Sequence, residues 1–335
     1  MNTRRVLVLV GVVGISLFVY LFWTDLVEAT RIIRGVQWQY ILVAVPIIFL
    51  VYLLYSAFYL SILKTLDASL VSIWRLYGLS LASAFVNAIL PSAGASGVSF
   101  LAAALKRDGV SSGQTSFMQI ARYMAIYTSY TLLLVVAIIS LYMGDIGRLA
   151  TIIAIAIAIN IIIVTILGIY ILYNKRAFNW FFRKLSKLID SIARRLRKGK
   201  DLIGIDRMER LLNSFHDSAS EAINQKIYLK QPFWLAFGVN LIEVSLLYLV
   251  FVALGSPVSF GVVIIAFAVA NGAGIVTVIP GDVGIYEIAM VTILSISGVP
   301  LAVGISATLV YRVLHKGLVL PFGFYFYNRY LREIT

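Results

Sequence analysis

Long apolar runs recur along the whole sequence, and several reach the roughly 20 residues that a helix needs to cross a bilayer. Six of these runs are regular, and we expect each to form a spanning helix: Val6–Trp23, Tyr40–Leu63, Thr115–Tyr142, Leu149–Tyr173, Phe233–Leu254 and Leu301–Tyr327. Hydrophobic residues make up 61% of the 335 positions and charged residues only 13%, too few polar side chains to cover a water-soluble protein. The sequence therefore predicts an all-α polytopic transmembrane bundle.

The first apolar run follows Arg4 and Arg5, and its composition resembles a secretory signal peptide. No small-residue cleavage site follows it. We therefore expect it to be retained as the first helix.

Two further apolar regions are interrupted by proline and glycine. The first, residues 74–105, is broken at Pro91 by PSAGASG, and the second, residues 259–298, is broken at Pro280 by PGDVG. The helix after the first break, Val98–Leu105, is about 12 Å long, too short for a hydrocarbon core of about 30 Å. We predict a re-entrant hairpin at residues 74–105. The second region fits either a re-entrant hairpin or a pair of spans.

Lys and Arg residues are enriched in cytoplasmic loops, and their positions predict the orientation. With the N-terminus in the cytoplasm, every basic cluster falls on the cytoplasmic side, the C-terminus included, and the two hairpins open from opposite faces. The similar strings FVNAILPSAGASG and NGAGIVTVIPGDVG then indicate an inverted repeat. We expect an N-terminal membrane half (1–173), a loop (174–231) and a C-terminal membrane half (232–335) in the plasma membrane.

The loop between the halves is strongly basic, with 14 Lys/Arg against 6 Asp/Glu between Lys175 and Lys230. Its apolar residues recur at helical spacing, which predicts an amphipathic helical hairpin on the cytoplasmic membrane surface. The basic residues expected to contact anionic lipid are Arg183, Lys184, Lys187, Arg194 and Arg195. The alternative is a connecting linker that happens to be basic.

Composition excludes several classes of site. The sequence has no cysteine and only two histidines, His216 and His315, so we expect no disulfide and no bound metal, with a carboxylate site left open as the alternative. The net charge of +13 is explained better by lipid headgroups than by nucleic acid, because the basic residues lie mostly at the ends of apolar runs. No Ser-His-Asp arrangement, Walker loop or HExxH motif is present, so we expect neither an enzyme nor a cofactor.

Polar residues gather at the two breaks. Irregular backbone at membrane depth persists only beside protein or water, and paired broken segments are typical of a transporter's binding site. The candidates at the first break are Asn87, Ser92, Gly94, Ser96, Gly97 and Ser99. Those at the second are Asn271, Pro280, Gly281, Asp282, Gly284 and Glu287. The alternative is that both breaks are loops at the membrane surface.

Ionisable residues inside apolar runs are rare and usually functional. The candidates are Arg122, Asn240, Glu243, Arg312, His315 and Lys316. Arginine is suited to bidentate phosphate binding, so these residues indicate either a phosphate site or buried ion pairs that hold the bundle together. His315 is a candidate proton switch, although a lone histidine among aromatic residues is more often a packing residue.

The string IVTVIPGDVGIYEIAMV resembles the Pro-Gly-x-x-Gly-x-x-Glu signature of the lysylphosphatidylglycerol synthase transmembrane region, also called the flippase-like family. LPSAGASG is similar to the family's first break, Arg122 to the arginine of its following helix, and TLVYRVLHK to its last helix. The family often has a second glycine where this sequence has Asp282. The resemblance covers essentially the whole sequence.

The resemblance implies a lipid translocase whose hairpins meet in the middle of the membrane. It also implies translocation without synthesis, because the soluble aminoacyl-transfer domain of some members is not in this sequence. The expected partners are membrane lipids, either anionic phospholipids or polyprenyl-linked lipids, and a homodimer is compatible with the sequence. Two alternatives remain: a secondary transporter of a small solute, and a membrane scaffold for a partner enzyme.

Overall fold

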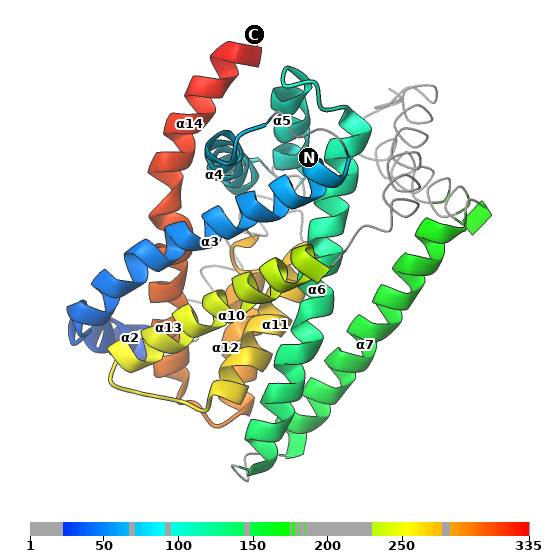
Figure 1. Ribbon diagram of the computed structural model, residues 1–335. Coiled ribbons are helices and arrows are strands. Elements are labelled where there is room, and N and C mark those ends of the chain that lie inside the picture. Colours follow the sequence, from blue (N-terminus) through cyan, green and yellow to red (C-terminus); the bar gives the residue numbers. More distant parts are fainter. Residues whose placement is uncertain are drawn as a thin grey trace, which may run out of the picture.

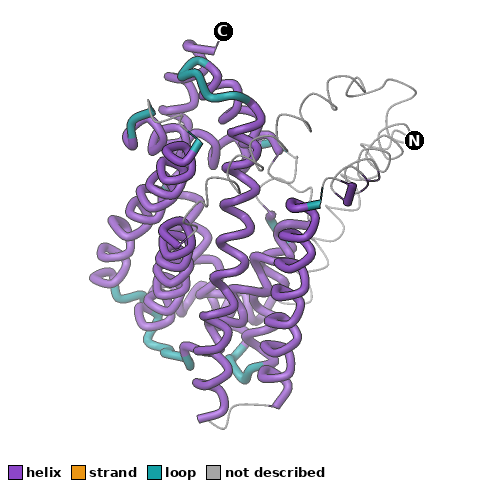
Figure 2. The backbone as a smooth tube through the Cα atoms, turned by 45° about the vertical axis from the view of Figure 1, so that its right-hand side comes forward, coloured by secondary structure: helices purple, strands orange, loops and turns teal. Residues whose placement is uncertain are grey.

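The computed structural model describes residues 23–66, 71–90, 95–143, 148–174, 230–276 and 282–334, together with four single positions between 176 and 184. Every regular element in these ranges is a helix, which confirms the predicted all-α membrane bundle. Figure 2 shows long helices running side by side, with the connecting loops mainly at the two ends of the bundle.

Four stretches of the described chain are long and apolar enough to cross a membrane. They are α3 (Trp38–Thr65), α6 (Ser112–Met143), α10 (Lys230–Ala253) and the run Leu301–Glu333, each of which matches a predicted span. A fifth predicted span forms α7 (Arg148–Tyr173), which lies beside α6 (Figure 1).

The predicted first span lies outside the described residues except for Trp23. This residue begins α2 (Trp23–Arg34), a helix that packs against the start of the last span.

The last span is not the single regular helix that the apolar run predicts. It consists of α13 (Leu301–Arg312), a π-helical turn η2 (Val313–Gly317) and α14 (Val319–Ile334). In the π turn the Leu318 N–H donates to the Val313 carbonyl, 3.1 Å away and five residues earlier. Insertions of this kind are frequent at functional sites.

The first broken region forms two short helices, α4 (Ile73–Ile89) and α5 (Ala95–Lys106), which pack against each other. Its two ends lie together, because Arg75 Nε in the first turn of α4 is 2.7 Å from Oδ2 of Asp108, just beyond α5. Arg75 Nη1 also lies 2.8 Å from Glu333 Oε2 near the end of α14. The segment therefore starts and finishes at the end of the bundle where α14 ends.

The second broken region forms α11 (Phe260–Val276) and α12 (Ile285–Ile296), which also pack against each other. It opens at the opposite end of the bundle, where the Gln37 N–H before α3 donates to the Ala253 carbonyl at the end of α10, 2.8 Å away. Figure 1 shows the loops before α11 and after α12 at the bottom, and α4, α5 and the C-terminus at the top. The two broken segments thus enter from opposite ends.

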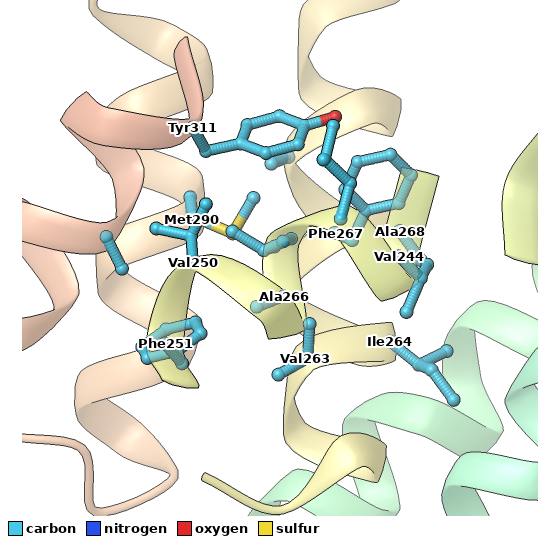
Figure 3. Close-up of a cluster of buried hydrophobic side chains, with 14 of the residues drawn as sticks. Val244, Val250, Phe251, Val263, Ile264, Ala266, Phe267, Ala268, Met290 and Tyr311 are labelled. Carbon is cyan, nitrogen blue, oxygen red and sulfur yellow. The ribbon is translucent and has the colours of Figure 1, made fainter. Parts of the chain in front are cut away.

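Buried apolar side chains form two clusters, one toward each end of the bundle. The larger cluster joins α10, α11, α12 and α13, and Figure 3 shows Tyr311 and Phe267 beside each other above Met290. The ring centroids of Tyr311 and Phe267 are 6.0 Å apart with perpendicular planes. The smaller cluster joins α4 and α5 to the ends of α3 and α6 that lie near them.

A layer of polar side chains separates the two apolar clusters. On α3 the larger cluster ends at Tyr52 and the smaller begins at Phe58, and on α6 the smaller ends at Met118 and the larger begins at Tyr130. On α10 the polar residues between the clusters include Asn240 and Glu243, both buried. On each of these three helices, the stretch between the clusters lies near the middle of the helix.

Two glycines bring α4 and α14 into close contact. A Cβ atom on Gly323 would lie 2.6 Å from the Leu81 carbonyl oxygen, and one on Gly78 would lie 2.5 Å from the Tyr330 hydroxyl. A larger residue at Gly323 would meet the backbone of Leu81 and force the two helices apart, whereas one at Gly78 would displace the side chains of Tyr330 and Phe326. The first broken segment is thus held tightly against the last helix.

Candidate functional site

Arg122 lies ten residues into α6, about 15 Å along its axis, and its guanidinium group is surrounded by tyrosine rings. The Cζ atom lies 4.6 Å from the ring centroid of Tyr123, 5.1 Å from that of Tyr55 and 5.7 Å from that of Tyr59. A cation over aromatic faces is stabilised by the ring quadrupoles, more strongly where water is excluded.

The spacing of tyrosines on α3 produces this arrangement. Tyr52, Tyr55 and Tyr59 are three and four residues apart, which places them on one helix face. The Tyr59 hydroxyl donates to Gln119 Oε1 on α6 at 2.9 Å, and the Tyr55 hydroxyl donates to Glu243 Oε1 on α10 at 3.3 Å. The hydroxyls therefore fix the rings that face the arginine.

Within the part of the chain that the structure describes, the Nε atom of Arg122 is buried and has no hydrogen-bond acceptor. No described carboxylate lies within ion-pair distance of the guanidinium group. Aromatic faces stabilise its charge but accept no strong hydrogen bond, and guanidinium has five N–H donors. Buried donors are nearly always paired, so this position is suited to an anionic ligand.

Glu243 and His315 form a second element of the site. Glu243 Oε1 lies 3.2 Å from His315 Nε2, which joins α10 to the π turn of the last span. The imidazole stacks on the Tyr311 ring with centroids 5.3 Å apart and planes 10° from parallel. The Glu243 side chain is only 8% exposed.

Glu287 and Arg312 form a third element of the site. Glu287 Oε1 lies 2.6 Å from Arg312 Nε, and Glu287 Oε2 accepts a hydrogen bond from the Gly284 N–H at 2.6 Å. The Arg312 guanidinium also lies over the Tyr286 ring, 4.6 Å from its centroid. Both oxygens of this carboxylate are thus engaged. Glu287 caps the start of α12 and joins this helix to the end of α13.

Lys316 and Asp282 complete the group. Lys316 interacts electrostatically with Arg312, Asp282, Glu243 and Glu287, and Arg122 interacts with Glu243. We refer to these residues together as the central charge cluster: Arg122, Glu243, Asp282, Glu287, Arg312, His315 and Lys316. They come from α6, α10, α12 with the turn before it, and the last span, so the fold gathers charges that are distant in sequence.

Asp282 has a left-handed backbone conformation, with φ of +61°. Glycine adopts this region without a steric penalty, and aspartate and asparagine adopt it more readily than other residues. The glycine that the family resemblance implies at this position would adopt the same conformation.

Three predicted site residues make hydrogen bonds that hold helices or a helix end in place. Asn87 Oδ1 accepts from the Gly97 N–H at 2.7 Å and the Ser96 hydroxyl at 3.2 Å, which caps the start of α5. Asn240 Nδ2 donates to the Ile126 carbonyl at 2.8 Å, joining α10 to α6. Asn271 donates to the Phe267 carbonyl of its own helix at 2.9 Å.

The predicted residues that lie outside the described part of the chain are Pro91, Ser92, Gly94, Pro280, Gly281, Arg183, Lys187, Arg194 and Arg195. Lys184 is described, and its ammonium nitrogen lies 4.6 Å from the Trp180 ring centroid.

The tyrosines around Arg122 and the π turn were not predicted from the sequence. The spacing of Tyr52, Tyr55 and Tyr59 was an available signal, because it places three hydroxyls on one face of an apolar helix.

Among the described residues, no group of three or more His, Cys, Asp or Glu side chains could hold a metal ion.

These features define a class: a multi-pass, all-α membrane protein with two broken segments and a charge cluster in its interior. The family model described as the lysylphosphatidylglycerol synthase TM region matches residues 7–323. The chain belongs to this family.

Two relatives, both UPF0104 membrane proteins of Methanothermobacter thermautotrophicus, are similar to the chain. One is 22% identical over 320 residues, which covers 95% of this chain and 93% of the relative. The other is 39% identical over 94 residues, 28% of each chain. The first similarity extends over both membrane halves and the loop between them.

Proposed function

We propose that this protein is a lipid translocase that moves the polar headgroup of an anionic lipid across the plasma membrane, and that it is not an enzyme. The observation that supports the proposal most directly is Arg122. Its guanidinium group is held in the interior by three tyrosine rings and has no carboxylate partner among the described residues. A phosphate group offers the acceptors that it lacks.

The physical barrier to lipid movement is the headgroup. A phosphate loses its hydration when it enters hydrocarbon, and burying an unpaired charge is very costly. The central charge cluster offers replacement partners near the middle of the helices, while the acyl or prenyl chains stay in the surrounding lipid. Anionic phospholipids and polyprenyl phosphates share this headgroup chemistry.

The residues of the cluster have different proposed roles. Arg122 binds phosphate directly, and Arg312 supplies a second positive charge while Glu287 holds it in place. Asp282 and Glu243 face the polar or cationic part of the headgroup. The basic loop, with both termini on the cytoplasmic side, holds the protein against anionic lipid.

The proposal is tested by reconstituting the full chain into liposomes that contain a trace of acyl-labelled fluorescent phosphatidylglycerol. Lipid that reaches the inner leaflet is protected from a membrane-impermeant quencher. We expect protein-dependent movement of this lipid above protein-free liposomes, and slower movement of labelled phosphatidylcholine. A labelled polyprenyl phosphate distinguishes the two lipid sources. If none of these lipids moves, the protein is not a translocase of this class, and a soluble-substrate transporter or a scaffold replaces the proposal.

A further inference from the structure

The Glu243–His315 contact joins two residues that are 72 positions apart in sequence, inside the membrane region. Their side chains are 8% and 17% exposed. An ion pair that only fastens two helices is usually made with arginine or lysine, whose charge is permanent near neutral pH. Histidine is the side chain whose ordinary charge change falls between about pH 5 and 8.

Titratable and charged groups face this pair from every element packed around it. Tyr55 donates to the same Glu243 oxygen, and Tyr311 stacks on the imidazole. The other groups that interact with Glu243 are Tyr52 of α3, Arg122 and Tyr130 of α6, Tyr286 of α12, and Lys316 on the turn of His315 itself. Besides Glu243, the charged neighbours of Lys316 are Arg312, Asp282 and Glu287.

The formal charges of the cluster balance when His315 is neutral. The three carboxylates are Glu243, Asp282 and Glu287, and the three basic side chains are Arg122, Arg312 and Lys316. One proton on His315 changes the sum from zero to +1. A positive cluster attracts a phosphate more strongly than a neutral one.

We propose that the Glu243–His315 pair is a proton-binding site, and that a proton and the anionic headgroup bind to the central charge cluster together. This inference rests on the proposed function and adds its coupling ion. Because linkage is reciprocal, a bound headgroup must favour the protonated histidine by the same factor that the proton favours the headgroup. His315 lies in the π turn, and insertions of this kind are frequent at functional sites.

The site itself is tested without measuring transport. The sequence has only two histidines, so His216→Gln leaves His315 as the one imidazole visible in a ¹⁵N-histidine NMR spectrum of the full chain. We expect a larger protonated fraction at each pH in nanodiscs with phosphatidylglycerol than in pure phosphatidylcholine. Glu243→Gln should lower that fraction, because it removes the negative charge beside the imidazole. Arg122→Gln should reduce the difference between the two lipids to the change that the same lipids cause at His216.

An anionic membrane also concentrates protons at its surface. The His315→Gln variant, in which only His216 remains, measures that effect on a histidine outside the pair. The inference is overturned if the lipid changes His315 no more than it changes His216, or if Glu243→Gln leaves the His315 titration unaltered.

Transport provides the second arm. We expect phosphatidylglycerol movement by the wild type to slow about fivefold or more between about pH 5 and pH 8, and the rate of His315→Gln to be independent of pH. His216→Gln should keep the wild-type profile. A pH-independent wild type that still moves lipid overturns the coupling but leaves the proposed function. A wild type that moves no lipid at any pH contradicts the proposed function, and the NMR titration still decides the proton site.

Discussion

Arg312 Nε lies 2.6 Å from Oε1 of Glu287, so the last span is tied directly to the first turn of α12. Glu287 is the glutamate of the sequence PGDVGIYE, and its other oxygen caps the helix that this sequence begins. The side chains are 11% and 23% exposed. The pair therefore holds the start of α12 in a defined position relative to the π turn.

Removing both side chains of this pair should destabilise the protein less than the two single changes added together. Glu287→Gln keeps an acceptor for the Gly284 N–H but leaves Arg312 without its carboxylate, and we expect a loss of about 1.5–3 kcal/mol. The double variant with Arg312→Gln should cost less than the sum of the two single variants, by about 1–2 kcal/mol. Thermal unfolding of the four proteins in one detergent measures this. Strictly additive effects would show that the two side chains do not interact.

The Tyr59 ring, rather than its hydroxyl alone, should support Arg122. Tyr59→Phe removes the hydrogen bond to Gln119 but keeps the aromatic face, whereas Tyr59→Leu removes both. A cation–π contact of about 1 kcal/mol corresponds to roughly a fivefold effect, so lipid movement should fall about that much further in Tyr59→Leu than in Tyr59→Phe. Both rates are compared at equal folded yield. Equal rates in the two variants would argue against a role for the ring.

Backbone conformation at Asp282 should decide which replacements are tolerated. With φ at +61°, a β-branched residue is strained there, so Asp282→Val should lower the free energy of unfolding by about 1–2 kcal/mol. Asp282→Gly should stay within about 0.5 kcal/mol of the wild type, since glycine adopts this conformation freely. The free energies of unfolding of the two variants, measured in detergent, test this prediction. A glycine variant as unstable as the valine variant would show that the side chain, not the backbone, matters.

Close packing of α4 on α14 should make Gly323 intolerant of a methyl group. Its Cβ would meet a backbone oxygen that cannot move away, so Gly323→Ala should cost about 1–3 kcal/mol. Gly238 in α10 is the matched control, because the nearest atom to its added Cβ is 3.9 Å away. Gly238→Ala should be neutral or slightly stabilising, as alanine favours helix. Similar thermal midpoints for the two variants would contradict the packing argument.

Much of this architecture follows from local sequence. Apolar runs of spanning length predict α3, α6 and α10 to within a few residues, because length and hydropathy alone determine whether a helix can cross a bilayer. Proline and glycine likewise predict where the two short helix pairs are interrupted. The apolar run of the last span predicts one continuous helix and gives no indication of the π turn.

The partners within the site depend on tertiary structure. The sequence identified Glu243, Glu287, Arg312 and His315 as unusual charges in apolar segments, but it could not assign the pairs. Glu243 meets a histidine 72 positions away, a contact set by how α10 packs beside the last span. The tyrosines around Arg122 were missed because the candidates were selected as charged residues in apolar segments, and tyrosine is uncharged and common in membrane helices.

The central claim is that Arg122 receives the anionic headgroup, and the most direct test is phosphatidylglycerol movement by Arg122→Gln in liposomes. Arg122→Lys is the companion variant, because it keeps the charge without the planar fork of donors. At matched folded yield, we predict loss of movement in Arg122→Gln and a rate between it and the wild type in Arg122→Lys. Wild-type movement in Arg122→Gln would contradict the account.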